Sequence, residues 1–350
     1  MSPSILTALL LSLGLGTAVT FASSHWLLAW MGLEINTLAI LPLMAQQHHP
    51  RATEAATKYF LTQAAATATL LFASITNAWM TGQWNIEQTT HPFPVTVITL
   101  ALALKIGLAP AHAWLPDVLQ GLNLSTGLIL ATWQKLAPLT LLLQIQPASP
   151  TVLPMLGLTS ILVGGWGGLN QTQLRKILAY SSIAHLGWMI IILQFAPSLT
   201  LLTLTIYIVM TLATFLAFKL NKATNMNSLS ISWTKNPTLT ALTPLVLLSL
   251  AGLPPLSGFM PKWLILQELT KQDLAIPATI AALAALLSLY FYLRLSYTLT
   301  LTISPNTLTG VTPWRLPHTQ TTLPLATLAA TTMLLLPLCP AMISLTTLIS

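Results

Sequence analysis

The amino-acid sequence predicts an all-α polytopic membrane protein with about eleven transmembrane helices. Of its 350 residues, 54% are hydrophobic and only 5% are charged, whereas soluble domains carry about 25% charged residues. A soluble chain so poor in charge could not cover its surface with polar groups. The apolar runs reach the length of about 20 residues that a membrane helix needs. The alternation of period two that marks membrane strands is absent.

Eleven apolar segments are separated by short polar connections. The expected helices cover residues 3–21, 25–44, 58–80, 95–120, 124–144, 150–170, 174–195, 198–218, 239–270, 275–298 and 323–346. We expect the fourth to be broken near Pro110 and the ninth near Pro254 and Pro255, because a proline inside a helix removes a backbone hydrogen bond. The longest connections, 219–238 and 299–322, are too short to hold a soluble catalytic domain.

Basic residues in the connections predict the orientation of the chain. With eleven helices, nine basic residues fall on one side of the membrane and only Lys271 falls on the other. The nine are Arg51, Lys58, Arg175, Lys176, Lys219, Lys222, Lys235, Arg294 and Arg315. Since cytoplasmic or matrix loops carry the excess of Lys and Arg, this bias places Met1 on the positive side.

The positions of the two broken helices predict an inverted repeat. They are the fourth and the ninth, so they occupy corresponding places if helices 1–5 and 6–10 are repeats. Each repeat would then contain an odd number of helices, and the second would start from the opposite side of the membrane. We therefore expect a single membrane domain, 1–350, with a first repeat at 1–145, a second at 150–298 and an extra C-terminal helix at 323–346.

Several kinds of site are excluded by the composition. Cys339 is the single cysteine, so the chain alone cannot form a disulfide or hold an iron–sulfur cluster. No phosphate loop, dinucleotide-binding fingerprint or zinc-binding HExxH helix is present. The net charge of +7 comes from scattered residues, which argues against nucleic acid as a partner. The first residues lack the basic segment of a cleavable targeting peptide, so we expect none.

Four ionisable residues fall inside the expected helices. Glu34, Lys105 and Lys135 lie about 14 to 16 Å along their helices at 1.5 Å per residue, close to the middle of a hydrocarbon core about 30 Å thick. Lys262 follows the second break. Because charged residues are costly at this depth, they usually mark ion pathways or proton relays.

These residues predict a proton relay. Lysine suits it, because its proton affinity changes readily on burial. Glu34 would pair with Lys105 and modulate the protonation of that lysine. Structural alternatives remain for each residue: a static ion pair that fixes helix packing, lysines that cap carbonyl groups or line a lipid site, and, for Lys262, a side chain that reaches the interface.

Three further residues are candidates beside these four. His112 follows the first break and His185 lies within a helix, where each could relay protons or act as a hydrogen-bonded packing residue. Asp117 is expected at the mouth of the path, with either a helix-end role or a role in proton uptake. We assign no function to the histidines near helix ends, which are His25, His48, His49 and His91.

Several longer motifs resemble a known family. They are HWLLAWMGLEINTLAILPLM (25–44), KYFLTQA (58–64), KIGLAPAHAWLPDVLQG (105–121), WQKLAP (133–138), RKILAYSSIAHLGWM (175–189) and GLPPLSGFMPKW (252–263). Together they are similar to the antiporter-like membrane subunits of respiratory complex I, in the mitochondrially encoded subunit 2 group. The length and the start directly at a helix resemble the animal form, which lacks the first three helices of its bacterial relatives.

The resemblance implies a proton-translocating core subunit in the membrane arm of NADH:ubiquinone oxidoreductase, in the mitochondrial inner membrane. Its helix-two glutamate matches Glu34, its broken-helix lysine Lys105, its central lysine Lys135 and its exit-side lysine Lys262. NADH, FMN, iron–sulfur clusters and ubiquinone would be used by other subunits, with no cofactor or metal in this chain. The implied partners are other membrane-arm subunits, and membrane lipid, with cardiolipin a candidate.

Other classes remain open from the residues alone. A free-standing cation/proton antiporter shares this helix plan and would exchange Na⁺ or K⁺ for H⁺ without partners. A solute or multidrug transporter would need a wider central cavity. A purely structural subunit would tolerate uncharged residues at Glu34 and Lys105, and the buried charges argue against it.

Overall fold

The computed structural model describes residues 2–46, 49–89, 91–145, 151–234, 237–301 and 323–349. Throughout these ranges the regular elements are helices, and the extended pairing is limited to two isolated bridges. The prediction of an all-α protein is therefore confirmed. Lys235, Arg315, His48 and most of the predicted 299–322 connection lie outside the described residues.

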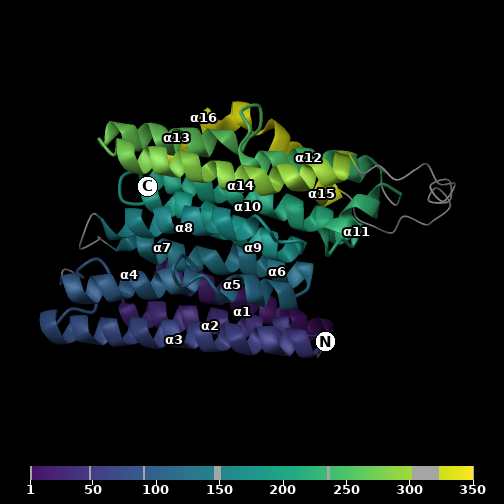
Figure 1. The fold of residues 1–350 in the computed structure, drawn as a ribbon. Helices are drawn as coiled ribbons and strands as arrows, with labels where there is room; N and C mark the ends of the chain where they lie inside the picture. The colour runs from purple at the N-terminus through teal and green to yellow at the C-terminus, as the bar shows by residue number, and fades with distance from the viewer. Residues whose placement is uncertain are drawn as a thin grey trace. The chain divides into compact units, whose positions relative to one another are not determined.

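The chain divides into two compact units, 1–160 and 161–350. The first contains α1 (Pro3–Ala22), α2 (Trp26–Met44), α3 (Pro50–Thr81), α4 (Pro92–Ile106), α5 (Trp114–Gly121), α6 (Leu124–Thr132), the 3₁₀ helix η1 (Trp133–Lys135) and α7 (Leu136–Gln144). In this unit α3 lies against α2, α4 and α5 (Figure 1). Helix α8 (Val152–Gly168) continues from this unit into the next.

The second unit contains the remaining helices. They are α9 (Leu174–Ile192), α10 (Pro197–Asn221), α11 (Met226–Ser230), η2 (Ile231–Thr234), α12 (Pro237–Ala251), α13 (Phe259–Lys271), α14 (Ala275–Leu301), α15 (Leu323–Leu334), η5 (Leu336–Leu338) and α16 (Cys339–Ile349). Here α10 contacts α9, α12 and α13, and also the C-terminal helices α15 and α16.

Six described helices are long and apolar enough to cross a membrane, and the bent pair α15 and α16 would make a seventh. The six spans are α1, α2, α3, Leu124–Gln144, α10 and α14. Helices α4, α8 and α12 are apolar but shorter, with 15, 17 and 15 residues. A multi-pass membrane protein is therefore confirmed, while the full count of eleven crossings stays a prediction.

Both expected breaks are present. Helix α4 ends at Ile106 and α5 begins at Trp114, with Pro110 between them. Helix α12 ends at Ala251 and α13 begins at Phe259, with Pro254 and Pro255 in the gap. The prolines cannot continue a helix because they lack the backbone N–H.

Two further interruptions were not predicted. The segment 124–144 contains the 3₁₀ turn η1, because Pro138 has no N–H to donate to the carbonyl of Gln134. The last helix bends by 68° between α15 and the segment that follows it. There Pro337 lies in η5 and likewise cannot continue the α-helical hydrogen bonds.

Each unit joins two of its connections by an antiparallel bridge. In the first unit His25 pairs with Asn85, and in the second Gln173 pairs with Asn225. Backbone hydrogen bonds of 2.9–3.1 Å flank the first bridge and of 3.1 Å the second. In the first unit the bridge ties the connection before α2 to the connection after α3, and in the second it ties the connection before α9 to the connection after α10.

Candidate functional site: a lysine-lined cavity beside the first broken helix

The end of α4 is shaped by Gly107. Its φ of +87° lies in the left-handed region, which glycine adopts without the steric cost of a Cβ. The amides of Gly107 and Leu108 donate to the carbonyl of Ala103 at 3.0 and 2.9 Å. This arrangement terminates the helix directly after Lys105 and Ile106.

The backbone freed by the break finds polar partners on α8. The amide of Ala109 donates to the hydroxyl of Ser160 at 3.0 Å, and Thr159 donates to the carbonyl of Ala109 at 3.5 Å. Irregular backbone within a membrane is tolerated only where such partners exist. Side chains of α8 therefore stabilise the break in α4.

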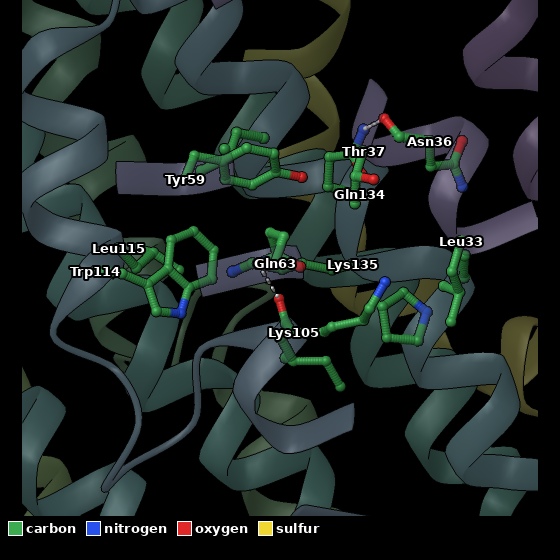
Figure 2. A pocket seen from close by; sticks show the side chains of 14 residues that line it. Leu33, Asn36, Thr37, Tyr59, Gln63, Lys105, Trp114, Leu115, Gln134 and Lys135 are labelled. Atoms are coloured by element: carbon green, nitrogen blue, oxygen red, sulfur yellow. Dashed lines mark hydrogen bonds between the residues drawn. The ribbon is translucent and has the colours of Figure 1, made fainter. Parts of the chain in front are cut away.

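A small buried cavity of about 20 Å³ lies beside this break (Figure 2). A cavity needs roughly 10–15 Å³ of this kind of space to hold one water molecule, together with two to four polar partners. The walls come from α2 to α7. The lining residues are Leu33, Asn36, Thr37, Tyr59, Gln63, Lys105, Ile106, Trp114, Leu115, Leu130, Gln134, Lys135, Ala137 and Pro138.

Lys105 and Lys135 both line this cavity. Lys105 comes from the last turn of α4 and is 5% exposed, while Lys135 comes from η1 and is 2% exposed. Two predicted proton carriers from different helices therefore share one water-sized space. Lysine ammonium groups at such a space can exchange protons with a bound water.

Glu34 lies close to the cavity without lining it. It follows Leu33 on α2, and its buried Oε2 atom has no hydrogen-bond partner within the described part of the chain. The ion pairs found there involve Lys58 and Lys271, so the expected pair between Glu34 and Lys105 is not a contact ion pair.

His112 and Asp117 lie away from the cavity. His112 is in the turn after the break, where its Nδ1 atom is 3.1 Å from the carbonyl of Pro110. Asp117 on α5 pairs with Lys58 at 3.4 Å, and Lys58 pairs with Glu54 at 2.9 Å. This exposed cluster surrounds an open depression of about 210 Å³ that Arg51 and Gly121 also line. The structure thus joins Asp117 to a charge cluster that the sequence did not predict.

Two candidates belong to the second unit. Lys262 lies in the first turn of α13, and its Nζ atom donates to the carbonyl of Ala251 at 2.8 Å across the second break. His185 on α9 is half-buried, and its ring lies 5.6 Å from the ring of Tyr207 on α10. Lys262 therefore caps a carbonyl, a role that the sequence analysis had considered for Lys105 and Lys135 and not for Lys262.

Sequence reasoning missed the neutral polar residues of the cavity. Gln63, Asn36 and Tyr59 are buried within apolar helices, and Gln134 donates to the carbonyl of Asn36 at 3.4 Å. Gln63 belongs to the motif KYFLTQA, but attention to charged residues left it without a role. A buried amide in a membrane helix was the signal that could have identified it.

Comparison with known proteins identifies the family. Residues 23–288 match the family described as NADH:quinone oxidoreductase/Mrp antiporter, and residues 289–343 match the C-terminus of NADH dehydrogenase subunit 2. The NADH-ubiquinone oxidoreductase chain 2 of Tetraodon nigroviridis is 70% identical over 345 residues, which cover 99% of both chains. This chain belongs to the NADH-ubiquinone oxidoreductase chain 2 family. The predicted resemblance is confirmed, and the chain is an antiporter-like membrane subunit of respiratory complex I.

Solved structures agree with this fold. A chain of respiratory complex I from Thermus thermophilus, solved with bound aureothin, is 28% identical with a TM-score of 0.78. The match covers 94% of this chain and 78% of that one. A chain of the Mrp complex from Dietzia is 17% identical with a TM-score of 0.80, covering 97% of this chain and 76% of that one, which supports the fold alone. The chain thus has an antiporter-like fold.

Proposed function

We propose that this chain 2 protein carries one proton path of complex I and that Lys105 and Lys135 form its centre. The observation that carries the proposal is that two buried lysines from α4 and η1 line the same water-sized cavity. Because an ammonium group buried in a membrane protein is costly without a function, their convergence favours proton transfer. Neutral polar groups around them supply hydrogen bonds for a water between the two lysines.

A proton taken up from the positive, matrix side would reach Lys105, pass through ordered water to Lys135, and leave near Lys262 toward the opposite side. Glu34 would regulate Lys105 by its charge at a distance rather than by direct contact. His112 and His185 are auxiliary candidates: the first lies outside the cavity, and the second has Tyr207 beside it. The order of these steps follows the pattern of the family.

The redox chemistry belongs to other subunits in this proposal. NADH, FMN, iron–sulfur clusters and ubiquinone would act there, and their electron transfer would drive proton movement in chain 2. The chain would sit in the mitochondrial inner membrane with its N-terminus on the matrix side. Its partners would include the neighbouring membrane-arm subunits and anionic lipid, for which cardiolipin is the candidate.

Replacement of Lys135 tests this function. In the assembled complex, Lys135→Met should lower the number of protons pumped per NADH oxidised by about the share of one channel, because methionine fills similar space but carries no proton. The measurement is proton uptake into inverted vesicles alongside NADH oxidation.

Lys271→Met is the matched control, because this lysine is exposed and forms a surface ion pair with Glu268 at 3.2 Å. The control should keep the normal stoichiometry. An assembled Lys135→Met complex that pumps the normal number of protons would overturn the proposed route.

A further inference from the structure

The end of α4 leaves carbonyl groups that its own backbone cannot satisfy. The last four carbonyls of any α-helix lack donors within the helix. At this end, Gly107 and Leu108 bond the carbonyl of Ala103, and Gly107 also lies 3.2 Å from the carbonyl of Leu104. These backbone bonds do not reach the carbonyl of Lys105. A buried carbonyl without a donor is costly, so another group must supply one.

Side chains from two neighbouring elements supply these donors, and Figure 2 shows the bond from the first of them, Gln63, to Lys105. Gln63 on α3 donates from Nε2 to the carbonyl of Lys105 at 3.3 Å. Trp114, the first residue of α5, donates from Nε1 to the carbonyl of Leu104 at 3.1 Å. Helices α3 and α5 are therefore both hydrogen-bonded to the last turn of α4, which carries Lys105.

The packing around these two donors holds them in place. Gln63 is 3% exposed, and the ring of Tyr59, one turn earlier on α3, meets the ring of Trp114 at 5.8 Å and 63°. Gly107 allows close approach, because a Cβ there would meet Leu115 at 2.9 Å and Trp114 at 3.3 Å. A buried hydrogen bond with so little freedom can fix a backbone position.

We propose that Gln63 and Trp114 form a carbonyl clamp that positions Lys105 in the cavity. The clamp consists of their two hydrogen bonds to the final turn of α4. It rests on the proposed function, and it adds two positioning residues to the relay. The clamp fixes the backbone of Lys105, so the ammonium group stays at the cavity, where it can exchange protons.

At the second break, the described part of the chain shows a different capping group. Gly252 has a φ of +83° and closes the end of α12 as Gly107 closes α4. There the carbonyl of Ala251 receives its hydrogen bond from the ammonium group of Lys262. A lysine thus acts as the cap at the second break. At the first break a neutral amide takes this role, so Lys105 need not use its own proton for capping.

Three substitutions of Gln63 in the full chain, within the assembled complex, test the clamp. Gln63→His keeps an N–H donor at about the same reach. Gln63→Met keeps the length without a donor, and Gln63→Glu keeps the shape but repels a carbonyl when ionised. The clamp predicts that His retains most of the protons pumped per NADH, whereas Met and Glu lose at least half of the contribution that Lys105→Met abolishes.

Matched controls separate the clamp from general damage. Gln83→Met removes an exposed amide from the same unit, and it should leave pumping unchanged. Trp114→Phe removes the second N–H with the aromatic ring retained and should act like Gln63→Met, whereas Trp79→Phe changes a tryptophan that is 88% exposed and should have no effect. Hydrogen exchange at the amides of Gly107 and Leu108 should become faster in the variants without a donor.

The order of the variants decides the question. If Gln63 only fills space, Met should be tolerated better than His, and that order would overturn the clamp. Assembly of the His variant together with loss of the whole complex in the Met variant would show a purely structural role and would also overturn it. Lys105→Met measured in parallel separates the two proposals. Normal pumping in that variant refutes the proton path itself, while normal pumping in Gln63→Met alone refutes only the clamp.

Discussion

The three lysines within the membrane helices differ in their surroundings. Lys105 and Lys135 line a cavity, whereas Lys262 donates to the carbonyl of Ala251. The sequence predicted that all three would lie within apolar helices; it left capping open for Lys105 and Lys135 and an interfacial position open for Lys262. It could not distinguish them, because the deciding partners are backbone carbonyls whose exposure depends on where a helix ends.

Two substitutions of Lys262 should separate capping from proton transfer. Lys262→Met removes the donor to Ala251 and should destabilise the second break by about 2 kcal/mol, the usual worth of a hydrogen bond from a charged group. Lys262→Arg can still donate but stays protonated, so it should retain stability and reduce proton release. Thermal unfolding of the complex and hydrogen exchange across residues 248–262 give the first quantity, and vesicle pumping gives the second.

The exposed Lys271 at the far end of α13 provides the control, since Lys271→Met removes only a surface ion pair worth about 1 kcal/mol or less. Equal stability of the Lys262→Met and Lys271→Met variants would show that the cap to Ala251 contributes nothing. Normal pumping in Lys262→Arg would remove Lys262 from the exit path.

At the level of helices, prolines predicted some interruptions and concealed others. Pro110 and the pair Pro254 and Pro255 lie in gaps between helices, so the breaks were evident from the sequence. Pro138 acts differently, because its effect falls four residues earlier, at the carbonyl of Gln134. The segment 124–144 therefore looked continuous, although its interruption at η1 is what carries Lys135.

The sequence analysis placed the start of the third helix at residue 58, whereas α3 begins eight residues earlier, at Pro50. Here too a proline decides where the helix lies. Arg51, Glu54 and Lys58 suggested a polar connection, but Pro50 begins the helix and His49 accepts a hydrogen bond from the amide of Arg51 at 3.3 Å. Proline at the first helical position has no N–H that would be left unbonded. Local capping thus overruled the apolar pattern on which the prediction depended.

Restoring the missing backbone bond should straighten η1. Pro138→Ala supplies an N–H for the carbonyl of Gln134, so the segment should become more regularly α-helical. Lys135 would then shift relative to the cavity, and pumping per NADH should fall although the helix itself is locally stabilised. Pro92→Ala is the matched control, because Pro92 is at the start of α4, where no donor is needed. Unchanged pumping in Pro138→Ala would show that the turn does not position Lys135.

At the scale of the whole molecule, the two units follow a similar plan. Each has a long helix, α3 or α10, that contacts a broken helix on both sides of its break. Each also has a bridge between its connections and a left-handed glycine at its break. These shared features support the proposed repeats at 1–145 and 150–298, although the two halves have little sequence similarity. What the two breaks share in the sequence is a left-handed glycine, Gly107 or Gly252, followed within three residues by a proline.

The proposed inverted repeat makes a prediction about topology that can be measured by labelling. In a chain with Cys339 replaced by serine, single cysteines are introduced as Ser2→Cys, Thr172→Cys or Gln272→Cys, at positions that are exposed in the structure. Six predicted helices separate the first two positions, and nine separate the first from the third. The positive-inside bias therefore predicts that a membrane-impermeant maleimide reaches Ser2→Cys and Thr172→Cys only from the matrix side, and Gln272→Cys only from the opposite side.

Intact mitoplasts and inverted inner-membrane vesicles present the two sides in turn, and detergent-solubilised complex shows that every cysteine can react. Ser2→Cys and Gln272→Cys could instead be labelled from the same side. In that case at least one broken helix, α4 with α5 or α12 with α13, would not cross the membrane once. The second unit would then not be inverted relative to the first. The expected pattern would instead establish that a broken helix of this length spans the membrane, which is the condition for its lysine to lie midway across.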